Sequence, residues 1–396
     1  MRYHIFLFLL ILNIDISLCQ TGTNLNDLLT HLFTTNNYNV YARPSNDQTV
    51  STLVSVDYYL AGISSLDEIA EKFTTTGYLS ITWTDDYLTW TPGSYGNIQE
   101  FYYPQGNVWK PDISVQNGFS KMQELGSTFV VVNVQSTGTV SWEPFELFET
   151  RCTVDTTHFP FDRQTCDLIF VCWSYKSTDV NMTVGSNGVQ LYEDFTSNGE
   201  WSVTTTTYNV DHDGFEVKIT FSITVQRKPQ YFVLNIIIPV ILVSLLNLIT
   251  FIIPCESGER LGYSITVWLT FAVFLTIVSG SLPKSANSTS VIAVYLMLML
   301  SIATLVVTIS AIQIRASSYS EEEKKIPKII ERMVLYINKK KNKVEEIKGP
   351  GSTEEKLECT VTWKEVNSTF DFIFFWIGFI LIFLITLICF CYIAAN

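Results

Sequence analysis

The residues best placed to do chemistry lie in a short segment between two cysteines. Cys152 and Cys166 enclose thirteen residues, and the centre of the segment reads Phe159-Pro160-Phe161-Asp162. Two cysteines at this spacing can form a disulfide, which would stabilise the fold by about 3 kcal/mol through its effect on the unfolded chain. An apolar centre is unusual for a loop in water, so we expect it to contact another apolar element. A disulfide-linked hairpin in a secreted β-domain is the alternative interpretation.

A second set of spaced residues lies in the apolar segment 261–282. Small, weakly polar and aliphatic residues recur there at intervals of four and three, which places them on one face of a helix. They are Gly262, Thr266, Leu269, Val273, Thr276 and Gly280. Bulky residues, including Trp268 and Phe271, lie on the other faces. A stripe of this kind can line a pore or serve as a helix–helix packing face.

Glu259 precedes this stripe. Around a symmetric ring of subunits it would form a circle of carboxylates, which favours cations. Leu269 and Val273 would then form an aliphatic constriction that closes the pore by excluding water. The flanking charge favours the pore interpretation over packing.

The elements that must position these residues are membrane spans and strands. The chain has 396 residues, of which 47% are hydrophobic and 16% charged, so more than one domain and several spans are expected. The apolar stretches 231–254, 261–282, 290–314 and 370–393 are each long enough to cross a hydrocarbon core of about 30 Å. Residues 1–19 have the plan of a secretory signal peptide, with an N-terminal anchor helix as the less favoured alternative.

Residues 20–230 alternate short strand-like runs with turn signals, which predicts an antiparallel β-sandwich. A short helix is expected at 24–33, and Asn181 begins a glycosylation sequon. The predicted fold is therefore an extracellular all-β sandwich followed by a bundle of four transmembrane α-helices. Segment 231–314 holds the first three spans, 315–369 a short cytoplasmic loop with an amphipathic helix at 356–370, and 370–396 the last span and an extracellular C-terminus.

The charge distribution agrees with this topology and excludes several functions. The net charge is −13, with an acidic 20–230 region and a lysine-rich 315–369 loop, as the positive-inside tendency predicts. Nucleic-acid binding is disfavoured for such an acidic surface. The cysteines and histidines lack metal-ligand spacing, and no nucleophile–base pair or phosphate-binding glycine loop is present. We therefore expect no enzyme, no metal and no cofactor.

Further motifs reveal a family resemblance that covers nearly the whole chain after residue 19. They are Trp83-Thr-Asp-Asp-Tyr-Leu-Thr-Trp90, Trp109-Lys-Pro-Asp112, Trp173-Ser-Tyr175, Asn198-Gly-Glu-Trp201 and Glu256-Ser-Gly-Glu-Arg260. Together with the Cys152–Cys166 loop, they make the chain resemble the Cys-loop, or pentameric ligand-gated ion channel, family, nearest its nicotinic acetylcholine receptor branch.

The resemblance implies an immunoglobulin-like sandwich of about ten strands. It also implies five identical or homologous subunits in the plasma membrane, around a pore lined by the second span. A small-molecule agonist, such as a cationic amine, would bind between extracellular domains, and both faces of that site occur on this one chain. The chain keeps Glu259 and lacks the proline insertion of anion channels, so we expect cation selectivity.

The resemblance also assigns an agonist site, in which aromatic faces hold a cation. Trp173 matches its central tryptophan, and the hairpin 204–217 would form a flap that carries Tyr208 and Phe215. The opposing face would consist of Tyr78, Ser80, Val132, Val134, Ser141 and Glu143. We expect Trp83, Trp90 and Trp109 to be structural core residues instead.

Two departures from the family pattern affect the identity of the agonist. The flap lacks an adjacent cysteine pair, and Gln116 stands where a tyrosine is usual. The sequence therefore does not specify acetylcholine as agonist, and Glu143 is either a ligand carboxylate or a solvated rim residue. A non-conducting accessory subunit is the alternative function.

A last set of residues is expected to couple agonist binding to the pore. In it, Arg227 would pair with Asp162 or Glu68 at a partly buried junction. The full set is Glu68, Phe159, Pro160, Phe161, Asp162, Arg227, Pro283 and Lys284.

Overall fold

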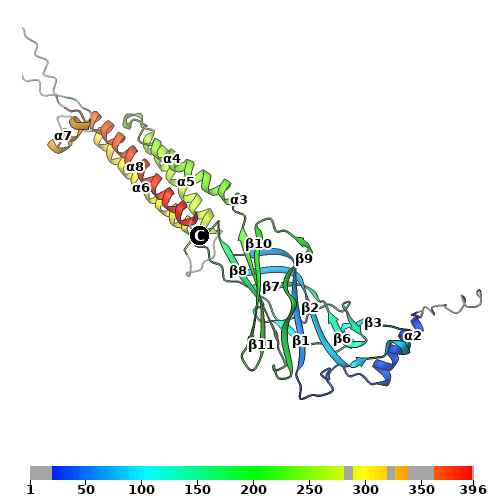
Figure 1. Cartoon of the computed structure of the whole chain (residues 1–396). Coiled ribbons are helices and arrows are strands. Elements are labelled where there is room, and N and C mark those ends of the chain that lie inside the picture. Colours follow the sequence, from blue (N-terminus) through cyan, green and yellow to red (C-terminus); the bar gives the residue numbers. More distant parts are fainter. Residues whose placement is uncertain (1–19, 281–288, 319–325, 338–360, 395–396) are drawn as a thin grey trace, which may run out of the picture. The chain divides into compact units, whose positions relative to one another are not determined.

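The structure is a computed structural model that describes residues 20–280, 289–318, 326–337 and 361–394 (Figure 1). The chain divides into two compact units. The first contains 20–154 and 163–226, and the second contains 155–162 and the described residues from 227 onward. The predicted signal peptide, 1–19, lies outside the described residues.

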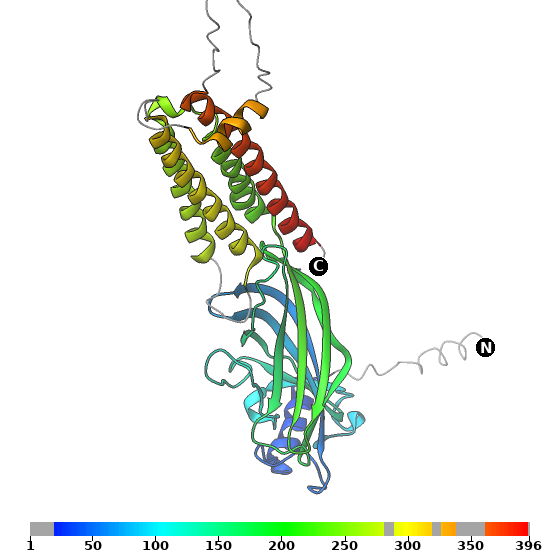
Figure 2. The same ribbon diagram turned by 90° about the vertical axis from the view of Figure 1, so that its left-hand side faces the viewer.

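The first unit is a sandwich of two sheets, as predicted (Figures 1 and 2). One sheet has the strand order β3-β5-β6-β2-β1-β9, and β7 pairs with the first half of β2. Its strands are β1 (Thr52–Asp67), β2 (Lys72–Thr89), β3 (Glu100–Pro104), β5 (Val131–Gln135), β6 (Thr137–Trp142), β7 (Phe145–Arg151) and β9 (Val180–Thr196). The other has the order β10-β11-β8-β4, with β4 (Ile113–Val115), β8 (Arg163–Cys172), β10 (Trp201–His212) and β11 (Val217–Arg227).

Alternating side chains explain the sandwich. Every second residue of β11 from Val217 to Val225 is buried, so that one face of the strand contributes to the core between the sheets. The structure corrects one detail of the prediction, because β1 and β9 run parallel rather than antiparallel. The expected opening helix is present as α2 (Gly22–Leu29), continued by a π-helical turn over Thr30–Thr35.

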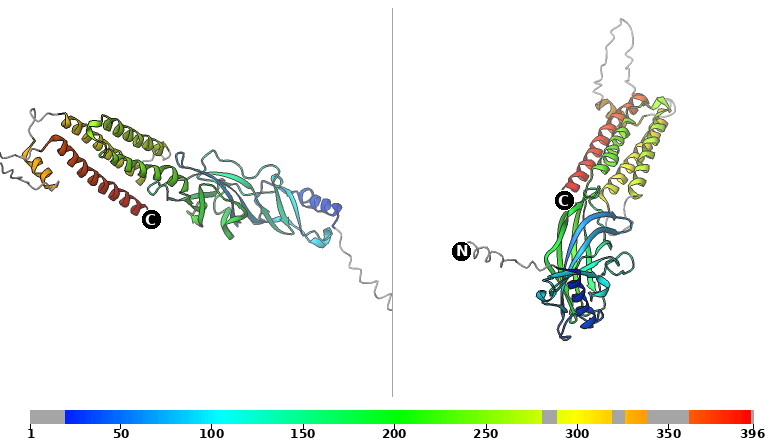
Figure 3. Two further views of the ribbon diagram at one scale, coloured as in Figure 1. Left: turned by 90° about the horizontal axis from the view of Figure 1, so that it is seen from above. Right: turned by 90° about the vertical axis from the view of Figure 1, so that its right-hand side faces the viewer.

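The second unit contains four helices of membrane-spanning length and composition. The first combines α3 (Gln230–Phe232), a π-helical stretch (Val233–Ile237) and α4 (Ile238–Ile249); the others are α5 (Arg260–Gly280), α6 (Val291–Ser317) and α8 (Trp363–Ala394). Figures 2 and 3 show α8, in red, alongside α4 and α6. The four predicted spans are therefore present as helices.

Two span boundaries differ from the prediction. The first helix ends at Ile249 and the chain then turns through Pro254, a residue that cannot continue a helix. The last begins at Trp363, seven residues before the apolar run, because polar residues of its first turns are helical too. Hydropathy locates the apolar part of a helix, not its ends.

The amphipathic helix of the loop also differs. The described helix is α7 (Lys328–Ile337), which packs Val334 against Val361, just before α8, and against Val366 in the first turn of α8. Of the predicted helix at 356–370, residues 356–360 lie outside the described ranges, and residues from Trp363 belong to α8 itself.

Candidate functional site

The segment between the two cysteines packs on helices, as its apolar centre predicted. Cys152 and Cys166 form a disulfide, with their Cα atoms 5.2 Å apart. Phe159 is 2% exposed and belongs to the apolar cluster of the helical unit, where its ring meets Phe232 edge-to-face at 4.7 Å. The carbonyl oxygen of Thr157 accepts a hydrogen bond from the backbone N–H of Val291 at the start of α6. An apolar loop centre and apolar helices thus form one core.

A buried ion pair fastens this segment. Nε and Nη2 of Arg227 lie 2.7 and 3.1 Å from the two carboxylate oxygens of Asp162, and both side chains are 2% exposed. The guanidinium also lies over the rings of Phe159 and Phe232, at 4.9 and 5.6 Å from their centroids. Of the two ion-pair partners predicted for Arg227, Asp162 is the one with which it pairs in the structure. Glu68 lies in the turn between β1 and β2 of the first unit, and its coupling role stays a prediction.

The tryptophan motifs of the β unit are structural, as expected. Trp83, Trp90 and Trp109 are at most 9% exposed, and Trp83 meets Trp109 edge-to-face at 5.9 Å. Asp85, from the same motif as Trp83, is fully buried and accepts a 2.6 Å hydrogen bond from the hydroxyl of Tyr38. Burial is the largest cause of its raised pKa, which reaches about 6.

The motif around Asp112 positions Trp173. The carbonyl and carboxylate oxygens of Asp112 accept hydrogen bonds from the backbone N–H groups of Trp173 and Ser174, respectively. Trp173 itself is 62% exposed. A large aromatic residue held by its backbone and left open to solvent is suited to contact a ligand or a partner.

The tip of the predicted flap folds onto the same segment. The N–H of Ser177 donates to the carbonyl oxygen of Phe215 at 2.9 Å, so Phe215 and Trp173 belong to one surface region. Asp213 caps the turn by accepting from the N–H groups of Glu216 and Phe215, which lowers its pKa. Phe215 is 64% exposed, and Nζ of Lys176 lies 5.7 Å from its ring centroid. The chain therefore places its own cation over this ring.

Tyr208 lies farther from the flap tip, on β10. It is 54% exposed, and its ring packs against the backbone of Gly188, where an added Cβ would lie 2.6 Å from the ring. Gly188 also has a φ of +64°, so glycine is required there twice over. Gln116 is exposed just beyond β4, and its backbone N–H donates to the carbonyl oxygen of Ile169.

The opposing wall is built around Tyr78 on β2. Its ring stacks on that of Tyr59 at 4.8 Å and meets Tyr192 edge-to-face at 5.8 Å. Burial first, and then the negative charge of Glu143, raises the pKa of Tyr78 to about 12, with a smaller contribution from Glu193. The wall is thus aromatic and negative, a combination that favours cations.

Strand pairing decides which other predicted residues belong to this wall. Ser80 is half-buried on the same face of β2 as Tyr78, and Ser141 is half-buried opposite Thr82. Val132 and Val134 were predicted wrongly: both are completely buried in the sandwich core. The outward positions of β5 are Val131, Asn133 and Gln135, since a shift of one residue moves a side chain to the other face.

The predicted stripe on α5 is open in the single chain. Val267, Phe271 and Val278 are buried against the other helices, whereas all six stripe residues are exposed, Leu269 by 51% and Val273 by 58%. Glu259 is exposed just before the helix begins. Because the packed face of α5 is a different one, the stripe does not serve helix packing among the described residues of this chain.

The sequence analysis missed a buried polar network beside Glu259. The guanidinium of Arg260 is 0% exposed, pairs with both carboxylate oxygens of Asp371 at 2.7 and 3.1 Å, and donates to Oε1 of Gln313 at 2.7 Å. It joins the start of α5 to α6 and α8. A lone aspartate near an apolar span was the signal available in the sequence, because such residues are normally paired.

Two predicted sites remain untested. Pro283 and Lys284 lie outside the described residues. Asn181 is half-buried on β9 with its side-chain carbonyl oxygen buried and without a hydrogen bond, and its glycosylation stays a prediction.

A β-sandwich joined to four membrane-length helices, with a disulfide-closed loop packed on those helices, defines a membrane-embedded receptor of the ligand-gated ion channel class. Family models agree: the neurotransmitter-gated ion-channel ligand binding domain matches residues 25–229, and the neurotransmitter-gated ion-channel transmembrane region matches 236–358. The chain belongs to the neurotransmitter-gated ion-channel family, whose members are channels and not enzymes.

Similar proteins are acetylcholine receptor subunits. The neuronal acetylcholine receptor subunit beta-4 of Gallus gallus is 28% identical over 318 residues, which are 78% of this chain and 67% of that protein. The neuronal subunit beta-2 of Rattus norvegicus is 31% identical over 281 residues, or 70% and 56%. The acetylcholine receptor subunit beta of Rattus norvegicus is 28% identical over 326 residues, or 78% and 64%. The chain thus spans between about half and two-thirds of these relatives.

Proposed function

We propose that the chain is one subunit of a pentameric, cation-selective channel in the plasma membrane, opened by an agonist that binds between neighbouring β-sandwiches. The observation that carries the proposal is the exposed stripe on α5. Its residues are small or aliphatic and exposed, while Val267, Phe271 and Val278 on another face of the same helix are buried. In a ring of subunits this face would line the central pore.

The proposed pore has a selective entrance and a hydrophobic gate. Glu259, exposed just before α5 begins, would contribute a ring of carboxylates that attracts cations. Leu269 and Val273, one helical turn apart, would form a constriction that conducts only when widened enough to hold water.

The agonist site would combine two surfaces of one chain in neighbouring subunits. Trp173 and Phe215 form one surface, and Tyr78 with Glu143 forms the other. A cationic amine suits the negative aromatic wall around Tyr78. Since Lys176 already occupies the face of Phe215, we expect the agonist cation to contact Trp173 and Tyr78 instead. Having both surfaces on one chain is compatible with a homopentamer.

The topology that follows has residues 20–230 and the C-terminus outside the cell and the 315–369 loop in the cytoplasm. Residues 1–19 would be removed as a signal peptide, and Asn181 would carry a glycan. The loop 159–162 would couple agonist binding to the helices through Arg227 and Asp162.

Expression of the chain alone in oocytes, with a screen of amines, amino acids and other transmitters, tests this function. We expect agonist-evoked currents whose reversal potential follows the cation gradient, and we expect Glu259→Ala to reduce the cation-to-anion permeability ratio severalfold. Glu331→Ala on α7 is the matched control and should leave the ratio unchanged. An unaltered ratio in Glu259→Ala would contradict the assignment of the pore entrance.

The accessory-subunit alternative is favoured by one observation, the Lys176 ammonium at the Phe215 face of the aromatic site. It predicts surface expression without current when the chain is expressed alone, and current when a second subunit is supplied.

A further inference from the structure

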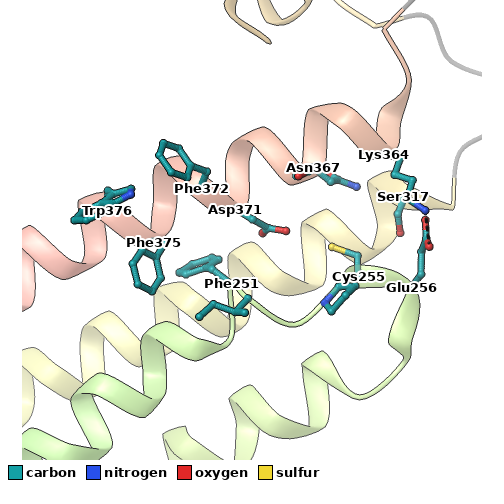
Figure 4. Close-up of a pocket in the computed structure, with 13 residues that line it drawn as sticks. Phe251, Cys255, Glu256, Ser317, Lys364, Asn367, Asp371, Phe372, Phe375 and Trp376 are labelled. Carbon is teal, nitrogen blue, oxygen red and sulfur yellow. Dashed lines mark hydrogen bonds and ion pairs between the residues drawn. The ribbon is translucent and has the colours of Figure 1, made fainter. Parts of the chain in front are cut away.

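A cavity of about 630 Å³ opens in the helical unit near the start of α8. Its wall comes from the end of the first span and the following turn, the end of α6 and the first four turns of α8 (Figure 4). This volume is in the range of sites that bind small molecules. The cavity shares no residue with the proposed agonist site or with the pore stripe, although Glu256 lies three residues before Glu259 in the sequence.

The cavity is polar at one end and aromatic at the other. Figure 4 shows Lys364 and Glu256 joined at the polar end, and Phe375 and Trp376 at the apolar end. Lys364 and Trp376 are twelve residues apart on one helix, which corresponds to about 18 Å. The cavity wall therefore follows α8 from its polar first turn into its apolar part. An amphiphile with its headgroup at the membrane surface would lie along the same direction.

The charged side chains at this cavity differ in whether they can bind a ligand. Asp371 accepts hydrogen bonds from Nη1 and Nη2 of the buried Arg260 and from Nε2 of Gln313, so its carboxylate is already paired within the protein. Lys364 and Glu256 form a 3.0 Å ion pair, but their side chains are 75% and 60% exposed. An ion pair this exposed contributes little to stability, so its two members can exchange partners readily.

We propose that this cavity binds a zwitterionic phospholipid, taken from the leaflet that meets the start of α5. The lipid phosphate pairs with Lys364 and its ammonium pairs with Glu256, so that one ion pair is replaced by two. The acyl chain lies against Phe372 and Trp376, whose rings are 60% and 48% exposed.

Charge complementarity favours this lipid over singly charged ones. An anionic lipid would pair with Lys364 and leave Glu256 without its cation. A cationic amphiphile would pair with Glu256 and leave Lys364 without its anion. A zwitterionic headgroup compensates both charges at once.

The test measures lipid binding to the purified full-length chain in detergent by native mass spectrometry. Dioleoylphosphatidylcholine and dioleoylphosphatidylglycerol serve as the zwitterionic and anionic probes. We expect the wild type to prefer phosphatidylcholine, and Glu256→Gln to shift the ratio of affinities toward phosphatidylglycerol by about threefold to fivefold. Glu331→Gln, an acid on α7 outside the cavity, should leave the ratio unchanged.

Three further variants guard against indirect effects. The exchange Glu256→Lys with Lys364→Glu keeps the pair and should restore the preference for phosphatidylcholine. Trp376→Ala should weaken binding of both lipids, whereas Phe383→Ala, which removes a comparably exposed ring of α8 outside the cavity, should not. Equal binding of the two lipids by the wild type, an unchanged ratio in Glu256→Gln, or equal losses in Trp376→Ala and Phe383→Ala would each overturn the proposal.

Discussion

At the scale of single residues, buried polar groups of this chain form hydrogen bonds that connect separate sequence motifs. Asp85 is the clearest case: its carboxylate accepts from the hydroxyl of Tyr38, which in turn accepts from the backbone N–H of Trp109. Two family motifs, one at Trp83 and the other at Trp109, are thus joined by one hydrogen-bonded chain. Their residue types serve the fold of the β unit and not a ligand.

The raised pKa of Asp85 predicts a pH-dependent stability. Its pKa rises from 3.8 to about 6 on folding, so the native state binds the proton more tightly than the unfolded state. The contribution is fully present below about pH 4 and is lost as the pH rises to about 6, with a total of about 3 kcal/mol. Asp85→Asn should abolish this slope in thermal unfolding of the purified chain between these pH values.

The exposed neighbour Asp86 supplies the control. Asp86→Asn should retain most of the slope, because burial, and not the charge of Asp86, is the largest cause of the raised pKa of Asp85. A slope that survives in Asp85→Asn would mean that another group causes it.

At the scale of elements, α5 presents two faces with different tasks. Phe271 is 1% exposed and packs in the core of the helices, whereas Leu269, two residues earlier, is 51% exposed. Substitutions at neighbouring positions of one helix should therefore have opposite kinds of effect.

We expect Leu269→Ser to change conduction without changing stability. A polar side chain in the proposed constriction should allow it to hold water and so increase current in the absence of agonist. Its effect on the free energy of unfolding should stay within about 0.5 kcal/mol. Phe271→Ala should instead destabilise the helices by about 3–5 kcal/mol and lower surface expression. Agonist-free current and surface labelling measure both effects, and low expression of Leu269→Ser would show that the stripe is a packing face.

At the scale of the whole molecule, the two compact units are not continuous in sequence. Residues 155–162 belong to the helical unit although the strands on both sides of them belong to the sandwich. The Arg227–Asp162 pair and the ring of Phe159 hold this excursion to the helices. The helical unit therefore includes a short segment that interrupts the sandwich in the sequence.

The ion pair predicts a large effect of single substitutions. Arg227→Ala should destabilise the chain by about 3–5 kcal/mol, because it leaves the carboxylate of Asp162 buried without a partner. Arg227→Lys keeps the charge but not the two parallel hydrogen bonds and should be intermediate. Lys218→Ala, which breaks a partly exposed pair between β11 and the preceding Glu216, is the control and should cost less than about 1 kcal/mol. Thermal unfolding of the purified variants in detergent measures these differences. Normal surface expression and normal currents in Arg227→Ala would contradict the prediction.

Sequence alone determined the local and strongly periodic features. Four apolar runs had to be spans, since no soluble core accommodates them, and the stripe of α5 followed from helical spacing. The disulfide loop was expected to meet apolar partners because its own centre is apolar, and Asp162 was one of the two partners foreseen for Arg227. Each of these conclusions depends on residues close in the chain or on charges that must be neutralised.

Only the tertiary structure decided features that depend on register and distant pairing. Alternation showed that Val132 and Val134 share a face, but strand pairing placed that face in the core. Tyr59 and Tyr192 joined Tyr78 only when β1, β2 and the end of β9 were brought together. Arg260 and Asp371 are 111 positions apart, and no local pattern identifies such a pair. Periodicity shows which nearby residues share a face of a strand or helix. Packing between segments distant in the sequence decides whether that face is buried and which side chains it contacts.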